Sequence, residues 1–239
     1  MQKVLWYTLP ADWSIVRRVR FIRQLKSKAL AIDPKLAAAY SHLGIAHDQN
    51  GEYDKAIEDH SKAIYINADS VGVYYNRGST YNDMGEYDKA IEDYSKAIAI
   101  NPKLAVAYSN RGESYAIKGK YDKAIEDYSK AITIDPKLIS AYCNRGFAHI
   151  NKGDFSMAIE DCSKAIAIDP KCADAYVYRG YAYHSNGEYD KAIEDYSKAI
   201  AINPKIATAY NNRGIAYRAK GEYEKAATDD GISRSLSQK

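Results

Sequence analysis

Residues 86–103 read EYDKAIEDYSKAIAINPK, and the same stretch returns letter for letter at 188–205, an offset of 102 residues. Weaker copies begin at Gly51, Gly119 and Gly153, so the chain repeats with a period of 34. A fixed period of this size is typical of repeat architectures built from one supersecondary unit. We expect five full units at 37–70, 71–104, 105–138, 139–172 and 173–206.

Each unit is predicted to contain two helices. In the second half of the unit 71–104, Ala90, Ile91, Tyr94 and Ala97 are spaced three and four residues apart, which places them on one helical face. Gly85 stands where the first helix must stop, because glycine adopts a left-handed backbone without penalty. A further glycine column, represented by Gly78, lies in mid-helix, where glycine costs about 1 kcal/mol relative to alanine. We expect a close approach of a second helix to compensate for this cost.

This pattern resembles the tetratricopeptide repeat, whose consensus is W-x2-L-G-x2-Y, then A-x3-F, then P. The resemblance covers roughly residues 20–228 and implies an all-α, right-handed superhelical solenoid of stacked helix-turn-helix units with about twelve to thirteen helices. It also implies a protein-protein interaction scaffold that binds an extended peptide or partner protein in its concave groove. The matching residues of one unit read Tyr74-x2-Arg77-Gly78-x2-Tyr81, then Ala90-x3-Tyr94, then Pro102.

Arginine stands in five units where the family usually has leucine, which only Leu43 retains. An arginine packed between helices needs a partner, since an unpaired buried charge is costly. The second helices carry aspartates that include Asp93 and Asp161, so one hypothesis is an Arg–Asp pair in each repeat. The alternative is a packed arginine stem with a solvated head. The arginine column is Arg77, Arg111, Arg145, Arg179 and Arg213.

The second helices are nearly identical, whereas three columns of the first helices drift from unit to unit along one helical stripe. In the fourth and fifth units these columns hold Phe147, Asp174 and Tyr181, and in the third unit Glu113. The resemblance implies that first helices line the groove, so the drifting columns would supply selectivity. Neutral drift on a solvated face is the alternative, and an exposed Phe or Tyr could also cap the core.

Between the drifting columns runs a steadier column that is rich in asparagine. An asparagine offers both a donor and an acceptor, so a row of them could pair with the main chain of an extended peptide. Each asparagine could instead bond within the array. The predicted groove residues are Asn76, Asn110, Glu113, Asn144, Phe147, Asp174, Tyr178, Tyr181 and Asn212. The family's clamp of lysine, asparagine and arginine for an acidic C-terminus is absent, and Glu113 and Asp174 would repel a terminal carboxylate.

No catalytic, metal or cofactor site is predicted. The five histidines fall in repeat columns, mostly in place of Tyr or Asn, and none has metal-ligand spacing with a second histidine or a cysteine. There is no P-loop, GxSxG or GxGxxG motif. Cys143, Cys162 and Cys172 fit neither a disulfide framework nor a zinc site, which favours a reducing compartment. We therefore expect a cytoplasmic protein that is not an enzyme.

Residues 1–36 differ in charge from the rest of the chain. The net charge is +3, yet residues 1–28 hold seven basic groups against Asp12 alone. Most of this segment is predicted to be a degenerate N-terminal repeat or capping helix. The alternative is an adaptor role in which basic residues among apolar ones contact a membrane or nucleic acid. The mildly acidic body argues against nucleic acid as a partner, and we expect a cap and not a membrane contact from this segment.

The sixth unit, 207–239, departs from the pattern after Ala227, where Asp230 and Ser233 replace the tyrosine and alanine of the other units. A repeat array needs polar end caps, because a terminal unit exposes the face that a neighbour would cover. We expect weak homo-oligomer formation through the array ends. An irregular cap made by the tail, or a polar end made by Asp229 and Asp230, is the alternative.

Overall fold

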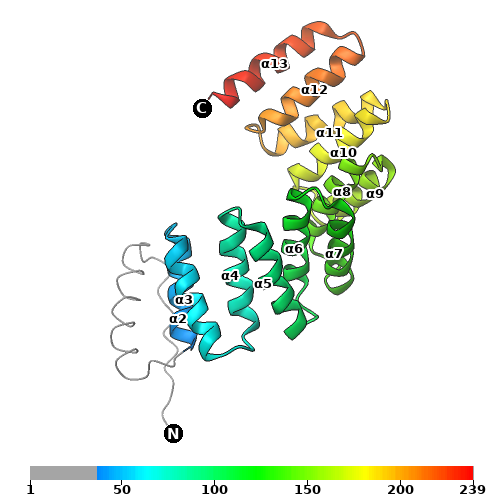
Figure 1. Cartoon of the computed structure of the whole chain (residues 1–239). Helices are drawn as coiled ribbons and strands as arrows, with labels where there is room; N and C mark the ends of the chain where they lie inside the picture. Colours follow the sequence, from blue (N-terminus) through cyan, green and yellow to red (C-terminus); the bar gives the residue numbers. More distant parts are fainter. Residues whose placement is uncertain (1–36, 239) are drawn as a thin grey trace. The chain divides into compact units, whose positions relative to one another are not determined.

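The computed structural model describes residues 37–238, and all of its regular structure in that range is α-helical (Figure 1). The degenerate repeat and the basic segment expected at 1–36 lie outside the described residues. The helices are α2 (Ala37–Gln49), α3 (Tyr53–Ile66), α4 (Val71–Asp83), α5 (Tyr87–Ile100), α6 (Ala105–Ile117), α7 (Tyr121–Ile134), α8 (Ile139–Lys152), α9 (Phe155–Ile168), α10 (Ala173–Ser185), α11 (Tyr189–Ile202), α12 (Ala207–Ala219) and α13 (Tyr223–Ser237).

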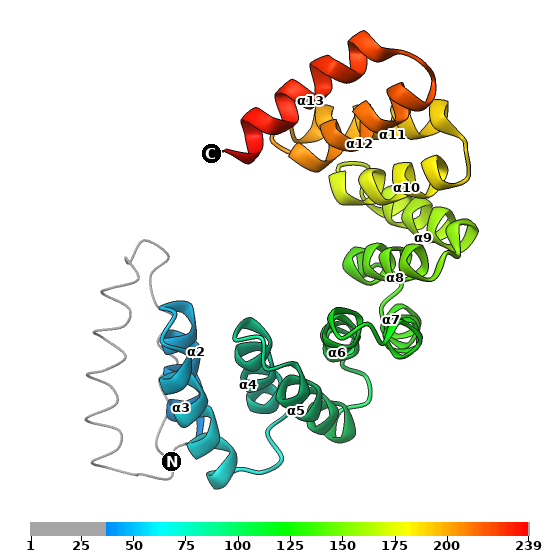
Figure 2. The ribbon, with the colours of Figure 1, turned by 45° about the horizontal axis from the view of Figure 1, so that its top comes forward.

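The chain divides into two compact units, Met1–Asn110 and Arg111–Lys239, with the boundary inside α6. In the first unit α2 pairs with α3 and α4 with α5, while α3 also contacts α4. In the second unit α8, α10 and α12 each pair with the helix that follows, and α8 contacts α10 directly. Figure 2 shows α8, α9 and α10 side by side in this arrangement. The expected all-α solenoid of helical hairpins is confirmed.

The core of three hairpins is built from small alanines and one large tyrosine. On α5, Ala90 and Ala97 are completely buried and Tyr94 is 1% exposed, as the spacing of these residues predicts. Tyr128 on α7 and Tyr196 on α11 are equally buried. Burial raises the pKa of the Tyr196 hydroxyl above its usual range. Alanine at the contact points lets the helices approach closely, and the tyrosine fills the space between them.

The mid-helix glycines make room for this tyrosine. A Cβ atom added to Gly180 on α10 would lie 2.8 Å from a ring carbon of Tyr196 on α11, closer than real Cβ contacts allow. The same relationship joins Gly78 to Tyr94, at 3.0 Å. The expected close helix approach is therefore confirmed.

The turn glycines end the first helices. Gly153 has φ = 82° and its N–H bonds to the last turn of α8, while the next N–H, of Asp154, donates to the His149 carbonyl at 2.9 Å. This is the bonding that a left-handed residue permits at a helix C-terminus. Since only glycine adopts this conformation without strain, the position recurs as glycine in every unit.

Each arginine of the repeat column binds the aspartate sixteen residues later, so the Arg–Asp hypothesis is confirmed. The arginine side chains are only 15–19% exposed, and the aspartates are nearly buried. The pairs are Arg77–Asp93, Arg111–Asp127, Arg145–Asp161, Arg179–Asp195 and Arg213–Asp229.

The arginines also reach backwards along the chain. The Nη1 atom of Arg145 donates to the Ser129 hydroxyl in the preceding repeat at 2.8 Å, and Arg179 bonds to Ser163 in the same way at 3.0 Å. Arg77 and Arg213 repeat the contact with Ser61 and Ser197. The guanidinium group therefore ties its own hairpin together and attaches it to the hairpin before it.

The last helix is longer than its sequence pattern indicates. The sequence departs from the repeat pattern after Ala227, yet α13 continues to Ser237. Asp230 takes the place of the usual tyrosine and accepts a hydrogen bond from Arg218 at 2.5 Å, while the Ser233 hydroxyl donates to the Ala207 carbonyl at 3.0 Å. Polar contacts thus replace the tyrosine in holding α13 against α12.

Candidate functional site

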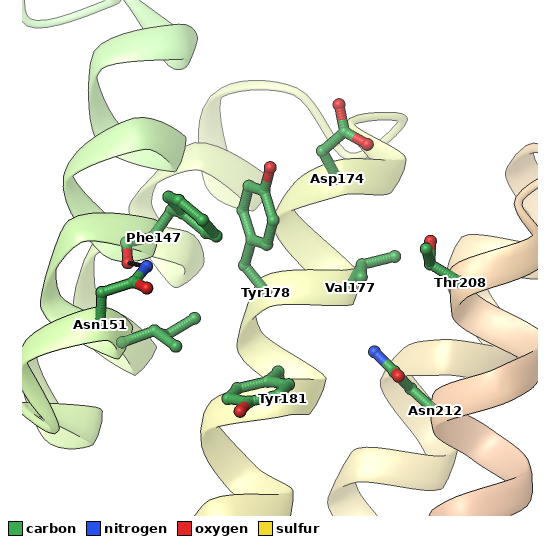
Figure 3. A pocket seen from close by; sticks show the side chains of 9 residues that line it. Phe147, Asn151, Asp174, Val177, Tyr178, Tyr181, Thr208 and Asn212 are labelled. Atoms are coloured by element: carbon green, nitrogen blue, oxygen red, sulfur yellow. Dashed lines mark hydrogen bonds between the residues drawn. The ribbon is translucent and has the colours of Figure 1, made fainter. Parts of the chain in front are cut away.

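A pocket of about 390 Å³ opens on the first helices of the second unit, across α8, α10 and α12 (Figure 3). Its lining is mainly apolar and aromatic, with a few polar groups. The lining residues are Phe147, Ile150 and Asn151 from α8, Asp174, Val177, Tyr178 and Tyr181 from α10, and Thr208 and Asn212 from α12.

The α8 side of the pocket is formed by the phenyl ring of Phe147, which is partly exposed to solvent. Phe147 is 42% exposed and lies against the ring of Tyr178, with centroids 5.4 Å apart and a tilt of 43°. Such tilted aromatic pairs stabilise one another beyond their burial. One turn further along α8, the Asn151 amide donates to the Phe147 carbonyl at 2.8 Å. The aromatic pair joins the two neighbouring repeats at the pocket wall.

The α10 side presents residues from three successive turns of one helix. Asp174, Val177, Tyr178 and Tyr181 are three or four residues apart and therefore share a face. Val177 is 8% exposed and forms part of the floor, whereas Tyr181 is 44% exposed. Figure 3 shows Asp174 at one end of this face and Tyr181 at the other.

Asp174 is the one charged side chain among the nine that line the pocket. Burial, and then the Asp174 carboxylate, raise the pKa of the Tyr178 hydroxyl above its usual value. Tyr178 therefore remains a neutral hydrogen-bond donor at physiological pH. The pocket combines an apolar body with a negative rim.

Five of the nine residues predicted from the sequence lie together in this pocket: Phe147, Asp174, Tyr178, Tyr181 and Asn212. Glu113 on α6 and Asn144 on α8 belong to the same compact unit but do not line the pocket. Asn76 on α4 and Asn110 on α6 belong to the other unit. The predicted set is thus split between the pocket and positions elsewhere in the array.

The predicted asparagine row does not behave uniformly. The Asn110 amide donates to the Tyr75 hydroxyl at 3.1 Å, which is a bond within the array. Asn212 accepts from the amide of Asn211 at 3.3 Å. The side chains of Asn76 and Asn144 are half-buried and make no hydrogen bond to any residue in the described range. Asn110 and Asn212 therefore follow the alternative of bonding within the array, and pairing with the main chain of a peptide stays a prediction for Asn76 and Asn144.

Asn151 is a lining residue that sequence reasoning missed. It stands four residues after Phe147 and so lies on the same stripe of α8. Its column also drifts between units, with Gln49, Ile117 and Ser185 at equivalent positions. Extending the column comparison by one helical turn would have found it.

Within residues 37–238, no group of three or more His, Cys, Asp or Glu side chains is arranged to hold a metal ion. No helix of that range has the length and apolar character needed to span a membrane. Three of the five histidines, His47, His60 and His149, are buried.

Three family models match the chain repeatedly. The tetratricopeptide repeat model matches 37–70, 71–104 and 139–172, and a second model of the same description matches 94–126 and 162–194. A third model, described as TPR repeat, matches 112–153 and 180–221. The chain belongs to the tetratricopeptide-repeat family.

Solved TPR structures resemble the chain closely in fold. MamA is 32% identical, with a TM-score of 0.61 over 67% of this chain and 94% of its own. A tetratricopeptide repeat protein from Parabacteroides merdae is 24% identical, with a TM-score of 0.73 over 93% of this chain and 86% of its own. YrrB, a TPR protein with an unusual peptide-binding site, is 22% identical, with a TM-score of 0.64 over 77% of this chain and 94% of its own. No curated protein matches the chain.

TPR solenoids are in general scaffolds for protein interactions and not enzymes, and this chain has that fold. The family's architecture stacks hairpins so that one layer of helices presents a continuous surface. In this TPR chain the pocket lies on that layer, in α8, α10 and α12.

Proposed function

We propose that the chain is a protein-interaction scaffold that binds an extended segment of a partner polypeptide across α8, α10 and α12, with an apolar or aromatic side chain of the segment in the pocket. The observation that carries the proposal is the pocket itself. It is lined by residues that differ from repeat to repeat, such as Phe147 and Tyr181, in an array whose other faces are nearly invariant.

The lining residues suit both an apolar side chain and the main chain of a peptide. An apolar anchor would displace water from Phe147, Val177 and Tyr181, and aromatic pockets of this kind supply most of the affinity in many interfaces. The polar groups of Asn151, Thr208 and Asn212 lie around the same opening, where amide and hydroxyl groups could pair with the peptide main chain. The anchor would give affinity and the polar groups would fix the direction of the segment.

The charge of the pocket favours an internal segment over a free C-terminus. Asp174 is exposed at the rim, and neither lysine nor arginine is among the lining residues. A terminal carboxylate placed there would be repelled by Asp174. A basic residue beside the anchor would be attracted instead. The likeness to YrrB, at 22% identity, supports the fold and carries none of that protein's binding residues to this chain.

The test begins with selection of ligands from a displayed peptide library on the full chain, followed by fluorescence anisotropy. Replacing Tyr181 by alanine should weaken the binding of the selected peptides about tenfold, because a buried aromatic contact is lost. Tyr65→Ala is the matched control, since Tyr65 is a 91% exposed tyrosine on α3 outside the pocket. Equal affinity of the two variants would contradict the proposal.

A pair of peptides tests the choice of an internal segment. Each selected sequence is made once with the anchor next to a free C-terminal carboxylate and once with that terminus amidated. The amide should bind more tightly, and Asp174→Asn should reduce the difference, because the repulsion from the carboxylate is removed. Tighter binding of the free acid would show that the pocket is a carboxylate site.

A further inference from the structure

Two thiols from opposite ends of the unit 139–172 meet beside the pocket. The Sγ atoms of Cys143 and Cys172 lie 3.6 Å apart, although the residues are 29 positions apart in the chain. Cys143 is on α8 and is 5% exposed, while Cys172 immediately precedes α10 and is half-buried. Both are free thiols in the structure.

The two thiols differ in acidity. The hydrogen bond with Cys143, together with the backbone N–H of Ala175, lowers the pKa of the Cys172 thiol below its ordinary value. The same contact and burial raise the pKa of Cys143. Cys172 occupies the N-cap of α10, where the helix dipole also favours a negative charge. Since the thiolate is the nucleophile, Cys172 is the reactive and accessible member of the pair.

The third cysteine has a different environment. Cys162 on α9 is completely buried, and burial raises the pKa of its thiol to about 12. Its sulfur fills the space beside Gly146, where an added Cβ would lie 2.9 Å from it. Cys162 therefore plays the packing part that tyrosine has in other repeats, and it serves as an internal control for reactivity.

We propose that Cys143 and Cys172 form a reversible disulfide under oxidising conditions, which links α8 to the turn that leads into α10. A disulfide needs the sulfurs about 2.0 Å apart, so the two atoms must approach by about 1.6 Å from their present separation. Cys172 lies in the short turn between α9 and α10, outside both helices, so its side chain can move without breaking a helix.

The chemistry is a thiol–disulfide exchange with a low-molecular-weight disulfide, for which oxidised glutathione is the probe. The Cys172 thiolate attacks one sulfur of glutathione disulfide, the S–S bond breaks, and one glutathione leaves as thiolate. The Cys143 thiol gives its proton to that thiolate and attacks the Cys172 sulfur, which releases the second glutathione. Two protein thiols lose two electrons, and one glutathione disulfide becomes two thiols.

The link would connect the two helices that form the aromatic wall of the pocket. Tyr178 packs against the buried cluster that contains Cys143 and Ala175, and Phe147 on α8 lies against Tyr178. Oxidation would therefore fix α8 and α10 to each other at this wall. The disulfide itself follows from the thiol geometry and does not depend on whether a peptide binds.

The experiment equilibrates the full chain in buffers with a graded ratio of oxidised to reduced glutathione, quenches with iodoacetamide, and maps the cysteines by mass spectrometry without reduction. Two of the three thiols should disappear together, with Cys143 linked to Cys172 and Cys162 alkylated only after unfolding. Dithiothreitol should restore both thiols. Cys143→Ser should stop at a mixed disulfide of Cys172 with glutathione, and Cys162→Ala should retain the link.

Circular dichroism checks that each variant is folded, and the mapping of the unaltered chain is decisive on its own. The proposal is overturned if Cys143 and Cys172 both stay alkylatable at every ratio. It is equally overturned if Cys172 stops at the mixed disulfide in the unaltered chain, or if the link involves Cys162 or a second chain.

Discussion

The guanidinium group of Arg145 binds both carboxylate oxygens of Asp161, with Nε donating to Oδ2 at 2.8 Å and Nη2 to Oδ1 at 2.6 Å. The Asp161 side chain is 1% exposed, so the pair is held away from water. The hydrogen bond to Asp161 raises the pKa of Arg145 above its already high value. Two-point binding in this geometry is the strongest form of ion pair that side chains offer.

Replacing Arg145 by leucine should lower the free energy of unfolding by about 3 kcal/mol, because Asp161 is left buried without a counter-charge. Urea denaturation followed by circular dichroism measures the change. Leucine is the natural residue at this column in the unit 37–70, where the buried Asp59 instead has His47 within 3.5 Å and Lys62 within 3.7 Å. At Asp161 the corresponding histidine, His149, has its Nε2 atom 4.0 Å from the carboxylate, farther than His47 lies from Asp59, so we expect it to replace the arginine only in part.

The control for this prediction is a second Arg–Asp contact that is exposed. Arg218 binds Asp230 with its side chain 43% exposed, so Arg218→Ala should lower the free energy of unfolding by less than about 1 kcal/mol. Equal losses in the two variants would mean that burial of the Arg145–Asp161 pair is not what makes it important.

His60 predicts a pH dependence of the first repeats. Its ring is completely buried, both ring nitrogens lack a hydrogen-bond partner within the described residues, and burial followed by the charge of Arg77 lowers its pKa to about 4. In the unfolded chain a histidine has a pKa of about 6.5. As the pH falls, the unfolded state therefore takes up a proton first, and stability is lost between pH 6.5 and 4.

From pH 7 to pH 5 this loss should be about 2 kcal/mol. His60→Tyr, which introduces the residue found at Tyr94 and Tyr128, should remove it. The exposed His42 provides the control, since His42→Tyr should keep the full pH dependence. Urea midpoints of the three proteins at both pH values measure the effect. If His60→Tyr loses as much stability between pH 7 and pH 5 as the unaltered chain, the pH dependence does not come from His60.

Two glycines on first helices should respond oppositely to alanine. Gly180→Ala places a methyl group 2.8 Å from the Tyr196 ring, and overpacking of about 1–3 kcal/mol should exceed the gain of about 1 kcal/mol in helix propensity. Nothing lies within 4 Å of a Cβ added to Gly72, so Gly72→Ala should raise stability. Thermal denaturation gives the sign of each change, and a lower Tm for Gly72→Ala would show that space is not the deciding factor.

Self-association through the array ends is the last prediction. α13 is the last helix that the structure describes, and Ile232 on it is 37% exposed. We expect weak, concentration-dependent dimerisation, which Ile232→Lys should reduce by placing a charge in the contact. Sedimentation velocity from low to high micromolar concentration measures it. One monomeric species throughout the range would remove the prediction.

The hairpins and the Arg–Asp pairs could be predicted because both depend on columns that recur. Five units carry an arginine and an aspartate in the same two columns, so Arg77 and Asp93 could be paired from their opposite charges alone. The serine contact was missed for the converse reason. Ser61 and its equivalents are the same in all five full units and differ only at Gly231 in the sixth, so nothing among the full units distinguished a hydrogen-bonding serine from a merely tolerated one.

The pocket was predicted only in part, because columns that vary between units identify a helix face but do not show which side chains on it enclose a cavity. Phe147 and Tyr181 were found by their variation, whereas the contact of Phe147 with Tyr178 depends on how far α8 lies from α10. The Cys143–Cys172 contact could not be predicted for a similar reason: it joins the first helix of a unit to the turn that ends the same unit, and 29 residues is not the repeat period. The length of α13 depends on polar contacts of Asp230 and Ser233 that the repeat pattern does not contain.

The backward and forward bonds of the arginines have the same reach, sixteen residues in each direction. If residues 139–172 were removed, Arg179 would follow Ser129 at the distance at which it now follows Ser163, and the junction would be chemically unchanged. Whole units can therefore be duplicated or deleted without a change in the Arg–Ser contacts at the junction. The pocket has no such freedom, because Phe147 and Tyr178 each occur in a single copy, so a change in the number of units would preserve the contacts between hairpins but change the residues available to a ligand.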